Sequence, residues 1–172
     1  MKRVRLIATC LFYFSRVLAL PYLATAAYCI ICFLFRTDSL QPIEDGKRFV
    51  ITYPFTDTRF LIGDAYEFYY IFEMIAFIAL YGIFFWLLGN IFKTFRGKKL
   101  FTQQGVRRLS IFYLLNFIVP LPFLIGHIAY SYEVEILVSL SVLHFVLGVF
   151  AYFMAVIFKQ GLNLQTEQDL YI

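Results

Sequence analysis

The stretch that decides the fold is Leu109-SIFYLLNFIVPLPFLIGHIAYS-Tyr132, followed by Glu133-Val134-Glu135 and then by Ile136-LVSLSVLHFVLGVFAYFMAVI-Phe158. Neither apolar run holds an Asp, Glu, Lys or Arg, and each is long enough to cross a bilayer, which takes about 20 helical residues. The connection 133–135 is so short that the two helices must be antiparallel neighbours. The sequence therefore predicts a pair of adjacent transmembrane helices over 109–132 and 136–158.

Two further apolar runs, over 17–35 and 68–92, are also long enough to cross a bilayer. Arg16 comes directly before the first of them and is expected to reach to the membrane surface, with residues 6–15 lying along that surface. Together the four runs predict an all-α membrane protein with four transmembrane helices in an antiparallel bundle. We expect one membrane domain over 1–172, with polar segments at 36–67, 93–108 and 159–172.

The composition agrees with a membrane protein and excludes other classes. Hydrophobic residues make up 62% of the chain, against about 45–50% in soluble domains, and charged residues 15%, against about 25%. A soluble sphere of this size could not hide so much apolar surface, because its surface is large relative to its volume. A soluble enzyme and a disordered tail are therefore excluded. The three cysteines all lie in apolar runs, so no disulfide framework is implied.

The positions of the basic residues predict the orientation. Lys and Arg gather before the first span and in 93–108, whereas the connection 133–135 holds none. Both termini and 93–108 are therefore expected in the cytoplasm, with 36–67 and 133–135 on the outer side of the membrane. The excess positive charge is explained by contact with the lipid bilayer, and no direct nucleic-acid binding is expected.

The longest polar segment, 36–67, contains two runs with the composition of strands. These are 48–53 and 59–62, separated by the turn-rich residues 54–58, which predicts a small β-hairpin outside the membrane between the first two helices. Asp64 and Glu67 are expected to cap the second helix. A lid over the helix ends is favoured for this segment, and recognition of a ligand or partner is the alternative.

A few polar residues lie inside the predicted spans, and each ionisable one costs about 2.5–3.5 kcal/mol at the bilayer centre on insertion scales. One hypothesis is that they form a cluster that binds a proton or a divalent metal, with help from Cys29 or Cys32. The favoured alternative is hydrogen bonding that fixes helix packing, because no metal-binding spacing occurs in the sequence. We therefore expect no metal and no cofactor. The members of this polar cluster are Glu73, His127, His144 and Asn116.

Two predicted cytoplasmic pieces carry a family resemblance. Gly97, Phe101-Thr102 and Arg107-Arg108-Leu109 form one pattern, and the chain ends with Gly161, a leucine and Glu167-Gln-Asp-Leu-Tyr-Ile172. This resembles a bacterial family of four-helix integral membrane proteins, catalogued as domain of unknown function 2975. The sequence departs from the family pattern in having Gly105 in place of a common Asn, and Gln168 and Tyr171 in place of Asn and Thr.

The resemblance implies little about activity, because the family has none established. Its members are often encoded beside a small helix-turn-helix regulator, which implies a membrane-bound sensor or a partner that sequesters the regulator. We therefore expect a non-enzymatic regulatory or partner-binding protein without catalytic residues. The rivals are a small transport or accessory subunit, an immunity-type protective protein and a metal-dependent membrane enzyme. The sequence also leaves open whether the protein forms a homo-oligomer.

The tail after Lys159 is the expected docking element, and packing against 93–108 is the equally weighted alternative. Opposite charges on the tail and on 93–108 are expected to hold the two segments together, as a latch that a cytoplasmic protein partner would open. The residues expected to bind that partner are Phe101, Thr102, Arg107, Arg108, Leu162, Leu164, Glu167, Asp169 and Leu170.

Overall fold

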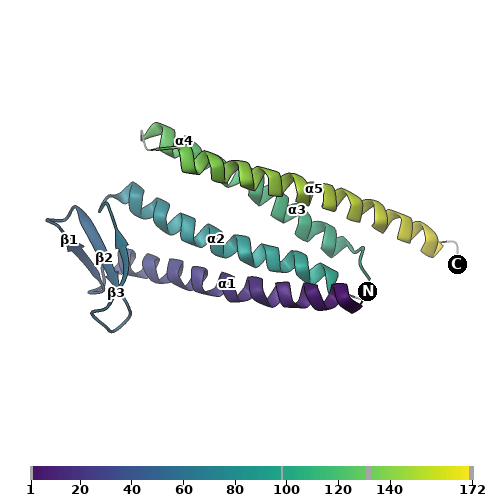
Figure 1. The fold of residues 1–172 in the computed structure, drawn as a ribbon, viewed down its shortest axis with the longest axis horizontal. Helices are drawn as coiled ribbons and strands as arrows, with labels where there is room; N and C mark the ends of the chain where they lie inside the picture. Colours follow the sequence, from purple (N-terminus) through teal and green to yellow (C-terminus); the bar gives the residue numbers. More distant parts are fainter. Residues whose placement is uncertain (1, 98, 131–132, 171–172) are drawn as a thin grey trace. The chain divides into compact units, whose positions relative to one another are not determined.

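The computed structural model describes residues 2–97, 99–130 and 133–170. Among them, four helices are long and apolar enough to span a membrane: Lys2–Phe35, Phe68–Phe95, Gln103–Ala129 and Glu135–Gln168 (Figure 1). A small antiparallel sheet stands between the first two. The predicted fold class is thus confirmed, and the four helices are consistent with a multi-pass membrane protein. The end of the predicted span 109–132 includes residues 131–132, which lie outside the described residues.

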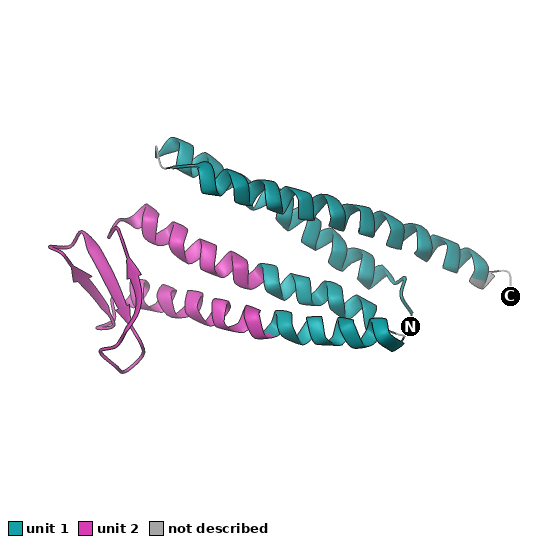
Figure 2. Cartoon of the chain, in the orientation of Figure 1, with its two compact units in different colours: residues 1–16, 84–172 teal, residues 17–83 magenta. Residues whose placement is uncertain are grey.

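The chain divides into two compact units, shown in Figure 2. Unit 1 comprises residues 1–16 and 84–172, and unit 2 comprises residues 17–83. The boundaries fall inside helices α1 (Lys2–Phe35) and α2 (Phe68–Phe95), so both helices contribute to both units. A single membrane domain over 1–172 stays a prediction.

The sheet of unit 2 has one strand more than the predicted hairpin. Strands β2 (Arg48–Thr52) and β3 (Arg59–Gly63) form that hairpin, and β1 (Leu40–Ile43) pairs with β2 on its other side. Pro42 lies in β1, opposite Phe49. Proline has no N–H to donate and is tolerated in a sheet at an edge strand, which is where β1 lies.

The sheet is packed on the helix ends of its own unit. Phe49 is fully buried with Cys29 and Cys32 of α1, and Tyr70 and Met74 of α2 pack against the same cluster. The Oη of Tyr28 in α1 donates a hydrogen bond of 2.8 Å to the carbonyl oxygen of Thr52. The two cysteines therefore act as small packing residues beneath the sheet.

In unit 1, α3 (Gln103–Ile118) and α4 (Pro120–Ala129) pack against α5 (Glu135–Leu170). The helical path is interrupted between α3 and α4 at Val119. The cause of the interruption is local, because Pro120 and Pro122 have no N–H to donate to the carbonyls of Asn116 and Ile118. Val119 itself keeps helical dihedral angles, and its N–H donates to the carbonyl of Leu115 at 3.0 Å.

Two local expectations were wrong. Residues 6–15 do not form a separate surface segment, because α1 runs without interruption from Lys2 to Phe35 and includes Pro21. Asp64 does not cap α2, which begins only at Phe68. The Oδ1 of Asp64 instead accepts a hydrogen bond of 2.7 Å from Arg48, and Arg48 donates a second hydrogen bond, of 3.0 Å, to Glu44. These two acceptors, Glu44 first, raise the pKa of Arg48.

Candidate functional site

The polar cluster is partly assembled in unit 1, where Asn116 of α3 meets His144 of α5. The Nδ1 of His144 lies 2.8 Å from the Oδ1 of Asn116, and the Nδ2 of Asn116 donates to the carbonyl of Phe112 at 2.8 Å. Since the amide oxygen can only accept, His144 carries its proton on Nδ1 in this contact. The side chain of Asn116 is thereby satisfied in a fully buried position.

The other members of the predicted cluster have different surroundings. His127 of α4 forms a 3.0 Å hydrogen bond through Nδ1 with the carbonyl oxygen of Glu133, at the connection between α4 and α5. Glu73 is 8% exposed and belongs to unit 2. A joint cluster of Glu73 with the histidines stays a prediction. In the described part of the chain, no three His, Cys, Asp or Glu side chains are grouped so as to hold a metal ion.

Small residues that follow His144 along α5 lie at the contact between α3 and α5. Gly148 is buried against Phe117, whose ring would lie 2.7 Å from a Cβ at this glycine. Ala151 and Ala155, one and two turns further along α5, are each 6% exposed. Small residues let two helix backbones approach closely, so this stripe fixes the position of α5 on α3.

Two residues of the predicted partner surface, Phe101 and Thr102, lie between α2 and α3, and Phe101 contacts the last part of α5. The ring of Phe101 lies against Gly161, where a Cβ would come within 2.7 Å, and its centroid is 5.3 Å from that of Phe158. Thr102 caps α3, because its Oγ1 accepts a hydrogen bond of 3.0 Å from the N–H of Gly105. The segment between α2 and α3 is thus fixed to the last part of α5.

The tail is a continuation of α5, which remains helical to Leu170. Its residues divide between two faces. Gly161, Leu162 and Gln165 are half-buried, and Leu164 and Glu167 are exposed, Leu164 at 61%. The tail therefore has a half-buried face, on which Gly161 contacts Phe101, and an exposed face, so that the two roles predicted for it are not exclusive. The side chains of Asp169 and Leu170 lie outside the described residues.

The predicted charge latch between the tail and 93–108 is not formed by Glu167. Among the side chains described, the ion pairs are those of Arg48 with Glu44 and Asp64. Arg107 is exposed, and Arg108 donates a hydrogen bond of 3.4 Å to the hydroxyl of Thr94 in α2. Among the described residues, the apolar contact of Phe101 with Phe158 and Gly161 joins the two segments.

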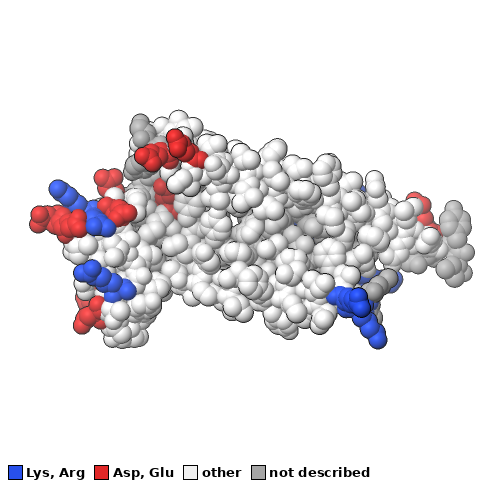
Figure 3. Space-filling model, in the orientation of Figure 1, with Lys and Arg blue, Asp and Glu red and all other residues white. Residues whose placement is uncertain are grey.

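Most charged residues of unit 1 are separated by sign along its helices, and Glu167 near the end of α5 is an exception (Figure 3). Acidic residues flank the start of α5 at Glu133 and Glu135, whereas the cations gather at the opposite ends of the helices. We use the name basic end for the region formed by the start of α1, the end of α2, the start of α3 and the last part of α5. Its described cations are Lys2, Arg3, Arg5, Lys93, Arg96, Lys99, Arg107, Arg108 and Lys159.

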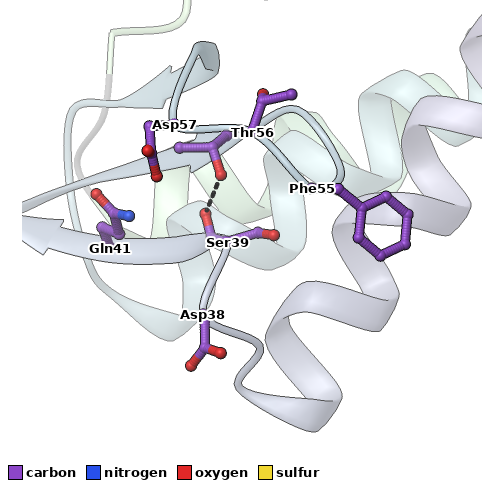
Figure 4. Close-up of a pocket in the computed structure, with 7 residues that line it drawn as sticks. Asp38, Ser39, Gln41, Phe55, Thr56 and Asp57 are labelled. Atoms are coloured by element: carbon purple, nitrogen blue, oxygen red, sulfur yellow. Dashed lines mark hydrogen bonds between the residues drawn. The ribbon is translucent and has the colours of Figure 1, made fainter.

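Two features were not identified as sites from the sequence. In unit 2, an open pocket of about 220 Å³ between the start of β1 and the β2–β3 loop is lined by oxygen-rich side chains (Figure 4). Asp38 and Asp57 lie on it, whereas the Phe55 ring is directed away from the other labelled side chains. These residues are far apart in the sequence and belong to no motif, so only the sheet brings them together.

The second is the setting of Arg16 in unit 1. Its guanidinium donates to the carbonyl oxygen of Trp86 at 3.1 Å and to the Oδ1 of Asn90 at 2.6 Å, and it lies 3.5 Å from the centroid of the Trp86 ring. Arg16 is thus held by α2. The only sign of this arrangement in the sequence was the position of Arg16 next to an apolar run, which does not reveal its partners.

Comparison with known proteins assigns the chain to a family. No curated protein and no solved structure matches the chain. The model of a family described as "Protein of unknown function (DUF2975)" matches residues 16–172, which is nearly the whole chain. This stretch includes both of the sequence patterns from which the resemblance was drawn. The chain therefore belongs to the DUF2975 family.

Proposed function

We propose that this chain is a non-enzymatic protein of the bacterial inner membrane that binds a cytoplasmic protein through the tail of α5. The observation that carries the proposal is the length and the two-faced burial of this helix. At 36 residues, α5 is about 54 Å long, whereas the hydrocarbon core of a bilayer is about 30 Å thick. Its apolar part ends at Phe158, so the polar remainder extends beyond the core as a helix.

The orientation of the proposal rests on the charge distribution. The basic end of unit 1 is the end from which the tail extends, and short segments rich in Lys and Arg remain in the cytoplasm. The connection at Glu133 and Glu135 would then lie on the outer side. Both termini are cytoplasmic in this arrangement.

Leu164 is the central contact in the proposed mode of binding. It is exposed on the tail, and Glu167 lies one turn further on. Helices commonly bind partners by placing such apolar residues in a groove of the partner. A regulator of the helix-turn-helix class, which the family resemblance implies, fits this role because it would be held at the membrane, away from DNA.

The test replaces Leu164 with Glu and compares the variant with Asn163→Glu, which adds the same charge at a neighbouring exposed position. Tagged proteins are purified from native membranes, and the soluble proteins that accompany them are identified by mass spectrometry. We expect a partner bound by the wild type and by Asn163→Glu to be lost from Leu164→Glu, with all three proteins equally abundant in the membrane. Retention of the same soluble proteins by Leu164→Glu would contradict the proposal.

Deletion of residues 162–172 supplies a second comparison. The contact of Phe101 with Phe158 and Gly161 lies before the deletion, so the helices of unit 1 keep it. We expect the truncated protein to enter the membrane and to bind no partner. Misfolding of the truncated protein would show that the tail has a structural role instead.

A further inference from the structure

In unit 1, two arginines lie next to one aromatic ring. Arg16 and Arg96 place their guanidinium carbons 5.1 Å and 4.6 Å from the centroid of the Phe12 ring. Arg96 also lies 5.4 Å from the centroid of Tyr13. Phe12 and Tyr13 belong to α1 and Arg96 to α2, so the arrangement joins the two helices within unit 1.

Stacking on aromatic rings orients these guanidinium groups but does not neutralise them. The partners of Arg16 are a backbone carbonyl and the amide of Asn90, both uncharged. Among the described residues, no carboxylate forms an ion pair with Arg16 or Arg96. Two cations are thus held close together without a counter-ion from the described chain, which is costly next to a membrane.

We propose that this pair binds the phosphate of an anionic phospholipid, with Arg96 as the principal contact and Arg16 at its side. Guanidinium groups are planar, remain charged and present several N–H donors that match the oxygens of a phosphate. The donors of Arg96 are not taken by a hydrogen bond in the described residues, so they are available to a headgroup. The proposal concerns a lipid site and does not depend on the partner proposed for the tail.

The position of the site favours a lipid over a soluble phosphate. Phe12 and Tyr13 lie in a helix that is long and apolar enough to span a membrane, and within unit 1 Tyr13 of α1 and Trp86 of α2 are exposed at 56% and 41%. The acyl chains of a lipid whose phosphate meets Arg96 would run along this apolar surface. Basic pockets between transmembrane helices are known to bind acidic headgroups in this way.

The chain contains its own reporter, because Trp86 is its single tryptophan and lies beneath Arg16. The purified protein is incorporated into vesicles in which either phosphatidylglycerol or phosphatidylcholine carries bromine atoms on its acyl chains. Bromine quenches tryptophan fluorescence only at contact distance. We expect brominated phosphatidylglycerol to quench Trp86 more strongly than brominated phosphatidylcholine at the same mole fraction.

Two variants locate the effect. Arg96→Gln should lower the preference for phosphatidylglycerol by about fivefold, the factor expected for the loss of one basic contact at an anionic surface. Arg96→Lys keeps the charge without the planar group and should lose part of the preference, which keeps the test decisive if Arg96→Gln does not fold. The matched control is Lys99→Gln, which removes an exposed cation of the same unit and should change the preference little.

Three outcomes would overturn the proposal. Equal quenching by the two brominated lipids would show that no anionic lipid is preferred. An equal effect of Lys99→Gln and Arg96→Gln would reduce the preference to general surface charge. Reversal of the preference by inorganic phosphate, at an ionic strength matched with chloride, would identify a soluble phosphate as the ligand instead of a lipid.

Discussion

At the scale of single residues, the hydrogen bond between His144 and Asn116 is the feature whose loss is easiest to interpret. Asn116 is 1% exposed, and its Oδ1 has His144 as its partner. A buried polar atom left without a partner costs about 1–3 kcal/mol. The pair therefore contributes to the packing of α3 on α5 as well as to the polarity of the bundle.

We expect His144→Ala to lower the free energy of unfolding by about 1–3 kcal/mol. Asn116→Leu combined with His144→Ala should cost less than the sum of the two single variants, with a coupling of about 0.5–3 kcal/mol. Unfolding in detergent micelles provides the measurement. The comparison variant is His127→Ala, whose histidine bonds to a carbonyl near the connection of α4 and α5, and a smaller effect is expected there. Strict additivity would mean that His144 and Asn116 act only as separate packing residues.

At the scale of elements, the sheet of unit 2 acts as a cover for two thiols. Cys29 and Cys32 are fully buried next to Phe49, whereas Cys10 in the other unit is exposed. The ring of Phe49 also packs on Phe33, with centroids 5.3 Å apart. A covering of this kind can be tested by the reactivity of the thiols beneath it.

In the folded protein, a maleimide should react with Cys10 and leave Cys29 and Cys32 unmodified. Phe49→Ala removes the central side chain of the sheet, at a cost of about 3–5 kcal/mol, so both buried thiols should become reactive. Phe55→Ala is the matched control, because this phenylalanine of the β2–β3 loop is fully exposed, and its loss should leave the thiols protected. Modified residues are counted by mass spectrometry. Protection of both thiols in Phe49→Ala would show that the sheet is not their cover.

At the scale of the whole molecule, the proposed orientation makes a prediction for four positions. Single cysteines at Asp57 and Glu135 should react with a membrane-impermeant reagent applied from outside intact cells. Cysteines at Lys98 and Glu167 should react only after the cells are opened, because positive charge keeps their segments in the cytoplasm. Lys98 itself lies outside the described residues. Reaction at Lys98 from outside would reverse the orientation and with it the proposed access of a cytoplasmic partner to the tail.

The helices could be predicted from the sequence because long apolar runs have few alternatives in a membrane. β1 was missed because Pro42 argues against a strand unless the strand is known to lie at an edge. Asp64 was wrongly assigned to a helix cap, since its partner Arg48 is distant in the sequence. The same reason applies to Arg16, because the faces that α1 and α2 turn toward each other decide its partners, Trp86 and Asn90.

The placement of the sheet between α1 and α2 has a consequence for biogenesis. In the proposed orientation, residues 36–67 must pass through the translocation machinery as an extended chain, and the strands can pair only afterwards. Each strand pairs with its neighbour in sequence, which favours rapid folding after passage. The core of the sheet, however, includes Ile71 and Met74 of α2, so it is complete only when the second helix has entered the membrane. Until then Phe49 and its neighbours remain accessible to chaperones and proteases outside the membrane, and insertion of α2 is the step that ends this exposure.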